Sequence, residues 1–194
     1  MGFREEQDSM GIVRVPAAAY YGSQTQRAVD NFPPSGLTPP RAFLHALARI
    51  KKHAASVNAE LDLLPAPLAE AIAQAAEAVL AGDLDDQFVV DLFQTGSGTS
   101  THMNMNEVLA SRANETLTGR RGGRSPVHPN DHVNIGQSSN DVIPSALHLA
   151  AVEGVEASLR PALRSLAEGL GEVAHRLEAV PKIGRPHLQD AVPM

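Results

Sequence analysis

The chain has 194 residues, and 43% of them are hydrophobic, so it is long enough and apolar enough to bury a sizeable core. Its formal charge of −6 argues against nucleic acid or an anionic membrane as the main partner, because both select basic surfaces. The sequence contains no cysteine, which excludes disulfides, thiolate nucleophiles and cysteine-ligated zinc.

The N-terminal stretch "MGFREEQDSM" carries charged residues where a signal peptide carries its apolar segment. No apolar run in the sequence approaches the length needed to span a bilayer. We therefore expect a cytoplasmic protein with no membrane partner and no nucleic-acid partner.

Apolar residues spaced by three and four positions predict helices over 41–61 and 67–80. The second helix opens at Pro67 and closes at Gly82. Strand-like alternation is scarce, so the sequence predicts a mainly α fold. The first helix carries an apolar stripe of Phe43, Leu47, Ile50, Ala54, Val57 and Leu61.

A third helix is predicted over 106–117, ending at Gly119. Composition rich in Pro and Gly predicts loops over 31–40 and 119–130. Within the second loop we interpret "RRGGR" as a solvated segment in preference to an anion-binding patch.

The last predicted helix continues from the segment 141–159, and Pro161 is expected to kink it or to mark a junction. Its apolar residues step by four and three, which is a heptad seam that packs lengthwise against other helices. Either a hairpin within this chain or a larger bundle can cover the seam, and we favour the bundle. The seam consists of Leu159, Leu163, Leu166, Leu170, Val173 and Leu177.

The stretch "QTGSGTSTHMNMNE" combines flexible glycines with hydroxyl groups just before a helix. Gly96 and Gly98 permit unusual backbone angles, while Ser97 and Thr99 supply hydroxyls. Free N–H groups at a helix N-terminus favour an anion, so the stretch is a candidate carboxylate cradle. An ordinary helix cap is the alternative interpretation.

The stretch "GQSSND" repeats this arrangement with Ser138, Ser139 and Asn140 ahead of the next helix, so the two helix starts can face one small anion. Capping is again the alternative. In "HPNDH", Pro129 and the Asn-Asp turn argue against a regular helical pair of His128 and His132, so we expect no metal there and no cofactor.

Several long motifs, taken in order, closely resemble the class II fumarases of the fumarase/aspartase superfamily. These are "DSMGIVRVPAAAYYGSQTQRAVDNF", "DDQFVVDLFQTGSGTSTHMNMNEVLASRA", "HPNDHVN", "QSSNDV" and "GRPHLQDA". The resemblance implies an N-terminal helical domain over 1–137, followed at 138–194 by the first part of a long-helix bundle domain. Family members are longer, so it also implies a fragment that lacks the family's mobile serine loop and is inactive alone.

The family reaction is the reversible hydration of fumarate to malate by acid/base anti-elimination, without a cofactor. By resemblance, His187 is the acid/base residue and a homotetramer builds each site from three subunits. The implied substrate carboxylate contacts are Ser97, Gly98, Thr99, Ser138, Ser139 and Asn140. The implied secondary anion site is His128, Asn130 and Asp131.

Some residues depart from the family pattern. Pro186 replaces a threonine and removes a hydroxyl and an N–H, and His102 replaces an asparagine. The arginine expected before "VHPND" has no clean match. These departures bear on substrate affinity more than on the fold.

Two rival interpretations remain. Aspartate ammonia-lyases share the scaffold, and "AYYG" and "DAVPM" resemble them, but those enzymes generally carry glutamine at the position of His187 and "STN" at the position of "SSN". A non-catalytic helical association module is the other rival, and it predicts assembly without turnover.

Overall fold

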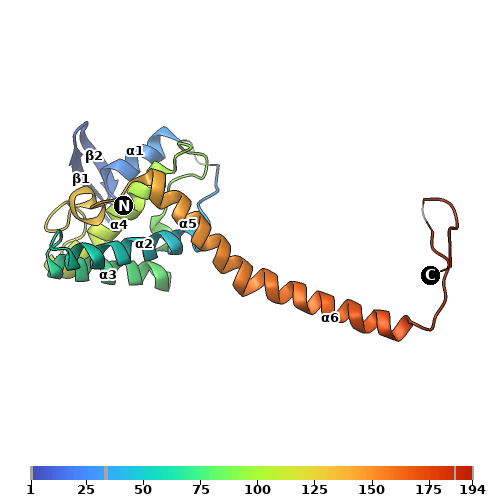
Figure 1. Ribbon diagram of the computed structural model, residues 1–194. Coiled ribbons are helices and arrows are strands. Elements are labelled where there is room, and N and C mark those ends of the chain that lie inside the picture. Colours follow the sequence, from blue (N-terminus) through green and yellow to red (C-terminus); the bar gives the residue numbers. More distant parts are fainter. Residues whose placement is uncertain (1, 33–34, 186, 194) are drawn as a thin grey trace. The chain divides into compact units, whose positions relative to one another are not determined.

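The computed structural model describes residues 2–32, 35–185 and 187–193, which belong to two compact units, Met1–Ala151 and Val152–Met194 (Figure 1). The mainly α prediction is confirmed. The predicted domain boundary between residues 137 and 138 lies just before α5 and stays a prediction. In chain order the elements are β1 (Phe3–Asp8), β2 (Gly11–Pro16), α1 (Ser23–Asn31), α2 (Arg41–Glu60), α3 (Ala66–Ala81), η1 (Asp85–Gln87), α4 (Thr99–Thr118), η2 (Pro129–Val133), α5 (Ser139–Gly154), η3 (Val155–Leu159) and α6 (Arg160–Leu177).

Helices α2, α3 and α4 form the core of the first unit, where α2 packs along α3 and α3 along α4 (Figure 1). Helix α3 ends where predicted, because Gly82 takes a left-handed conformation with φ 91°. The α2 stripe is only partly right: Phe43 and Leu47 are buried, whereas Val57 and Leu61 are 49% and 61% exposed.

Helix α4 begins at Thr99, which corrects the predicted start at residue 106, and ends at Gly119 as predicted. From Thr101 onward its first turns are mostly buried although they are polar, because several of their side chains and amides find partners inside the protein. The amide of Thr101 donates to Gln94 Oε1 at 3.0 Å, and Asn104 Nδ2 donates to the carbonyl of Gln87 at 3.0 Å. A search for apolar spacing therefore misses these turns.

The antiparallel hairpin β1–β2 was not predicted. Its strands pair from Phe3 opposite Pro16 to Asp8 opposite Gly11. Only Val13 and Val15 from the two strands contribute apolar side chains to the buried core, so the alternation is too short to identify from the sequence.

A buried carboxylate on α4 holds the start of α1. Glu107 is 5% exposed, and its two oxygens accept hydrogen bonds from the backbone amides of Gly22 at 2.9 Å, Gln24 at 2.9 Å and Thr25 at 3.0 Å. These are amides that a helix leaves without intrahelical partners. Glu107 therefore acts as the N-terminal cap of α1 from a distant part of the chain.

The loop at 119–124 is solvated at Arg120, Arg121 and Gly123, as the interpretation of "RRGGR" predicts, and it is also hydrogen-bonded to the first unit. The guanidinium of Arg121 lies 3.9 Å from the ring centre of Tyr20 and pairs with Glu115 at 3.0 Å. The amide of Gly122 donates to Ser111 Oγ at 2.8 Å.

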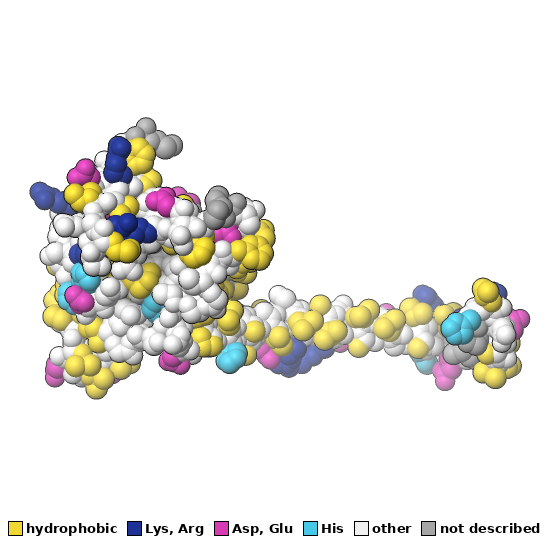
Figure 2. All heavy atoms as spheres, turned by 90° about the horizontal axis from the view of Figure 1, so that it is seen from above, with side chains coloured by type: hydrophobic (Ala, Val, Ile, Leu, Met, Phe, Trp, Pro, Cys, Tyr) yellow, Lys and Arg dark blue, Asp and Glu magenta, His cyan; other side chains and the backbone are white. Residues whose placement is uncertain are grey.

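Helix α6 buries none of its residues in the structure described, and its apolar seam is 40–61% exposed. Hydrophobic side chains recur along this helix in Figure 2. Pro161 lies in the first turn of α6, directly after the π-helical turn η3, so a helical irregularity occurs next to the expected junction. Within the second unit, the described residues do not bury the seam.

The helical run Ser139–Leu177 is long and apolar enough, by length and composition only, to cross a membrane. This corrects the expectation that the sequence contains no such segment. A single helix of this kind is weak support for a membrane protein, because core helices of other proteins pass the same test.

We expect the exposed seam to drive self-association, since burial of each leucine stabilises by about 1.5–3 kcal/mol. Leu163→Glu should shift the chain toward monomer in sedimentation velocity at micromolar concentration. The control is Ser165→Glu, which adds the same charge away from the seam. A monomeric parent chain, unchanged by Leu163→Glu, would contradict this expectation.

Candidate functional site

The starts of α4 and α5 carry hydroxyl groups that meet in space. Thr99 Oγ1 lies 2.8 Å from Ser97 Oγ and 3.2 Å from Ser139 Oγ, although Thr99 and Ser139 are 40 positions apart. We call Ser97, Thr99 and Ser139 the hydroxyl cluster. The structure thus brings together three of the predicted site residues.

Gly98 allows this approach in two ways. It has φ 68°, a left-handed conformation that glycine adopts without strain, and a Cβ at this position would lie 3.1 Å from Ile143 Cγ2 of α5. The absence of a side chain at residue 98 therefore lets the first turn of α4 lie directly against α5.

The hydroxyl cluster does not cap α4 within the described part of the chain, so the capping alternative fails for Ser97 and Thr99. The amide of Thr101 bonds to Gln94 and that of His102 to the carbonyl of Gly98. Among the described residues, the amides of Thr99 and Ser100 have no protein acceptor. They lie at the positive end of the α4 dipole, where an anion is favoured.

At α5 the capping alternative holds for Ser138. Its Oγ accepts a hydrogen bond from the amide of Asn140 at 3.2 Å, and its carbonyl accepts from Val142 at 2.9 Å. Asn140 is exposed. Ser138 and Asn140 thus lie beside the hydroxyl cluster without belonging to its hydrogen-bonded chain.

The turn predicted as a secondary anion site is closed by its own histidine. His128 Nδ1 accepts hydrogen bonds from the amides of Asn130 at 3.2 Å and Asp131 at 3.1 Å, so its proton belongs on Nε2. The 3.3 Å contact from Nδ1 to Asp131 Oδ2 is then not an ion pair. Burial lowers the pKa of His128, Asp131 opposes that shift, and Arg124 adds to it.

These contacts occupy two amides that an anion would need, so the anion role of His128, Asn130 and Asp131 stays a prediction. The residues from Pro129 to Val133 form a single π-helical turn, and His128 precedes it in an extended conformation, so His128 and His132 do not form a regular α-helical pair, as predicted. The amide of His128 donates to His132 Nδ1 at 2.9 Å. Across the described ranges no group of three His, Cys, Asp or Glu side chains is placed to hold a metal ion.

His187 belongs to the second unit and is described there on its own. It is exposed, in a turn with φ 51°, a backbone conformation that is uncommon for residues other than glycine. The turn is closed by backbone hydrogen bonds, including Gly184 to Val192 at 2.8 Å. Pro186, whose effect on the site was in question, lies outside the described residues.

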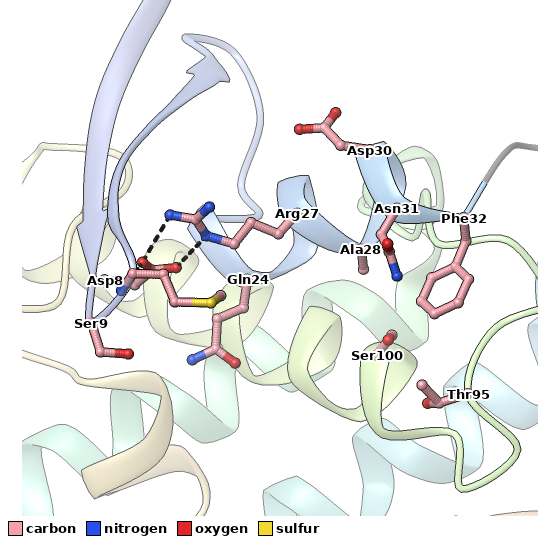
Figure 3. Close-up of a pocket in the computed structure, with 11 residues that line it drawn as sticks. Asp8, Ser9, Gln24, Arg27, Ala28, Asp30, Asn31, Phe32, Thr95 and Ser100 are labelled. Carbon is pink, nitrogen blue, oxygen red and sulfur yellow. Dashed lines mark hydrogen bonds and ion pairs between the residues drawn. The ribbon is translucent and has the colours of Figure 1, made fainter.

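A cavity of about 740 Å³ is lined by Thr95 and Ser100, which are close in sequence to Ser97 and Thr99, and by Arg27 from α1 (Figure 3). Arg27 is engaged by Asp8, with nitrogen to oxygen distances of 2.8 and 3.0 Å. The hydrogen bond from Arg27 lowers the pKa of Asp8. The guanidinium is therefore committed to a carboxylate of the hairpin and is not a free anion receptor.

Sequence reasoning missed two residues that shape this region. Gln94 fastens the loop before α4, because Nε2 donates to Thr101 Oγ1 at 2.5 Å while Oε1 accepts from the Thr101 amide. Lys51 of α2 is fully buried and its Nζ lies 3.0 Å from Asn134 Oδ1. The sequence indicates the burial of Lys51 only through its position among the apolar residues of a helix.

Gly98→Ala should destabilise the chain by about 1–3 kcal/mol, because it combines a left-handed backbone with a crowded contact to Ile143. Urea unfolding would measure the effect. Gly96→Ala is the matched control in the same loop, since a Cβ there meets nothing within 4 Å, and it should change stability by less than about 0.5 kcal/mol. Equal effects of the two substitutions would contradict the assigned role of Gly98.

Comparison with known proteins places this geometry among lyases. Residues 11–194 match the family described as Lyase. The chain is 54% identical over 192 residues to the class II fumarate hydratases of Halobacterium salinarum and Nitrosomonas europaea, covering 99% of this chain and 41% and 42% of theirs. The crystal structure of recombinant class II fumarase from Schistosoma mansoni matches all of this chain with a TM-score of 0.95 and 44% identity, covering 41% of that chain. A fumarate lyase:delta crystallin from Brucella melitensis matches with a TM-score of 0.93 and 45% identity, covering 45% of that chain.

Proposed function

The chain belongs to the lyase family, and from this premise we propose that it forms part of a class II fumarate hydratase, which adds water reversibly to fumarate to give malate. It spans 41% and 42% of the length of the two curated relatives described above. The observation that carries the proposal is the hydroxyl cluster, in which two separate helix starts present hydroxyls to one place.

The chemistry of hydration explains the use of such a cluster. The proton removed from malate is alpha to a carboxylate, so the intermediate places an additional negative charge on that carboxylate. Fixed donors stabilise this charge if they are oriented before the reaction. The hydroxyls of Thr99 and Ser139 and the unpaired amides of Thr99 and Ser100 are donors of this kind, and they surround the positive end of α4.

His187 completes the proposal as the residue that moves protons. An imidazole can donate and accept a proton near neutral pH, whereas glutamine can only form hydrogen bonds. Hydroxide is a poor leaving group, so the elimination of water needs an acid. These properties support fumarate hydration over ammonia elimination.

We extend the proposal to assembly and location. The exposed seam of α6 supports a homo-oligomer, which we propose to be a homotetramer that binds a dicarboxylate in the cytoplasm. We further propose that a substrate carboxylate is surrounded by Ser97, Gly98, Ser138 and Asn140.

The test is turnover in a protein of the relatives' length that carries these residues, with Thr99→Val and Ser139→Ala as variants. Each removes one hydroxyl of the cluster and should lower kcat/KM for malate about tenfold or more. Thr116→Val is the control, because that hydroxyl bonds to a carbonyl of its own helix at 3.1 Å. We expect the 194-residue chain alone to show negligible turnover.

Two results would contradict the proposal. A clear preference of the unsubstituted protein for aspartate over malate would exclude fumarate hydration as its reaction. Unchanged kcat/KM in both hydroxyl variants would leave the family assignment in place and remove the cluster from the substrate site.

A further inference from the structure

A cluster of Lys51, His102 and Asn134 lies inside the first unit and joins three parts of the chain. Lys51 comes from α2 and His102 from α4, while Asn134 lies between η2 and α5. Lys51 Nζ lies 3.0 Å from Asn134 Oδ1 and 3.3 Å from His102 Nε2, and His102 Nε2 lies 2.7 Å from the same Oδ1. Lys51 and His102 are 0% and 2% exposed.

These distances fix the proton positions. Asn134 Oδ1 lies within hydrogen-bonding distance of both Lys51 Nζ and His102 Nε2, and an amide oxygen can only accept. That oxygen accepts from His102 as well, so the histidine proton lies on Nε2 and Nδ1 is the buried atom without a partner in the described residues. A second proton on His102 would lie on Nδ1, which has no acceptor in the described residues. His102 is therefore a neutral donor with one tautomer.

The same segment is held at further points. Asn58 of α2 donates to the carbonyl of Ile135 at 3.2 Å, and Gln137 Nε2 donates to the carbonyl of Val133 at 3.0 Å. Gly136 turns the chain with φ 68°. The segment 133–137 is thus fastened from inside by α2 and α4, and α5 begins two residues later.

One face of helix α4 makes hydrogen bonds to two points of the segment 134–139, which leads into α5. Thr99 and His102 are three residues apart, a spacing that places side chains on the same side of a helix. Thr99 bonds to Ser139, and His102 bonds to Asn134. The position of Ser139 relative to Thr99 therefore depends on where Asn134 is held.

We infer that Lys51 and His102 are positioning residues for the hydroxyl cluster, because they hold Asn134 and thereby set the start of α5 against the start of α4. The catalytic meaning of this inference rests on the proposed function. The structural part of the inference does not rest on the proposed function, since it concerns only how stably residues 134–142 keep their backbone structure in this chain.

Hydrogen exchange of the 194-residue chain tests the structural part. The amides of Asp141 and Val142 donate to the carbonyl of Ser138 at 3.1 and 2.9 Å, and they report on the first turn of α5. Lys51→Met and His102→Leu should accelerate their exchange about tenfold or more. Exchange in α3 should remain unchanged in both variants.

Three controls separate positioning from general weakening. Lys52→Met changes the neighbouring lysine, which pairs with Glu77 on the surface, and should leave exchange unaffected. His102→Gln keeps an amide donor near the place of Nε2 and should restore most of the protection of Val142. In the parent chain, nitrogen chemical shifts of His102 should show the proton on Nε2.

Equal acceleration in α3 and α5 would overturn the inference, because it would show that the cluster only stabilises the whole unit. Unchanged exchange at Asp141 and Val142 would overturn it as well. In a protein of the relatives' length, Lys51→Met should lower kcat for malate while Lys52→Met does not. If the unsubstituted protein lacks malate turnover, the proposed function fails and the exchange result stands.

Discussion

Glu107→Ala should lower the free energy of unfolding by about 3–5 kcal/mol, the largest effect that we expect from one substitution in this chain. Two of the three amides that it serves, those of Gly22 and Thr25, make buried hydrogen bonds to it. Without the carboxylate these amides lose their acceptor, and a buried donor without an acceptor costs about 1–3 kcal/mol. Urea unfolding followed by circular dichroism measures the change.

Glu107→Gln is the matched variant, because it keeps one oxygen and replaces the other with a donor that faces a backbone N–H. We expect it to be destabilised, but less than Glu107→Ala. A loss below about 1 kcal/mol for alanine would mean that α1 finds another cap. Gly22 supports the assignment, since a Cβ there would lie 3.0 Å from Glu107 Oε1.

The stability of the chain should rise with pH between about 7 and 10.5 because of Lys51. Burial lowers the pKa of Lys51 from 10.5 to about 7 in the folded chain. Between these values the unfolded chain binds a proton that the folded chain has released, so raising the pH favours the folded state. The contribution is on the order of 5 kcal/mol, and below pH 7 the full cost of the buried charge is present.

The measurement is the unfolding free energy of the parent chain and of Lys51→Met across this pH range. As the pH rises from about 7 to 10.5, the unfolding free energy of the parent chain should increase relative to that of Lys51→Met, whereas the difference between the parent and Lys52→Met should stay flat. Among the titratable groups described, His102 from α4 faces Lys51. Burial, and to a smaller extent the charge of Lys51, lowers the pKa of His102 to about 4. It is neutral throughout the tested range, so a difference independent of pH would show that Lys51 does not titrate there.

The sequence predicted the elements whose apolar spacing and end signals agree. Helix α3 is the clearest case, because Pro67 lies near its start and Gly82 takes the left-handed turn that ends it. The hairpin and α1 were missed for a physical reason. Their stability comes from contacts made at a distance, such as Glu107 with the amides of α1, and no local pattern records such contacts.

The candidate site was predictable in its residue types but not in its geometry. Glycine and hydroxyl residues before two helices indicated that both helix starts can face one anion, and the structure places Thr99 beside Ser139. The distinction between Ser138, which caps α5, and Ser139, which faces α4, depends on the direction of the side chains. The sequence "SSN" alone does not contain that information.

Helix α4 is buried on nearly all sides, and this sets how freely the chain can change over evolutionary time. Thr99 and His102 bond to the segment that leads into α5, and Glu107 bonds to the start of α1. Asn114 pairs with both backbone groups of Val127 at 2.7 and 3.0 Å. These polar side chains have partners of fixed geometry, so a single substitution at one of them has no nearby compensation. We therefore expect the span 99–114 to accept few amino acids in a mutational scan, whereas surface positions of α6 away from its seam accept many.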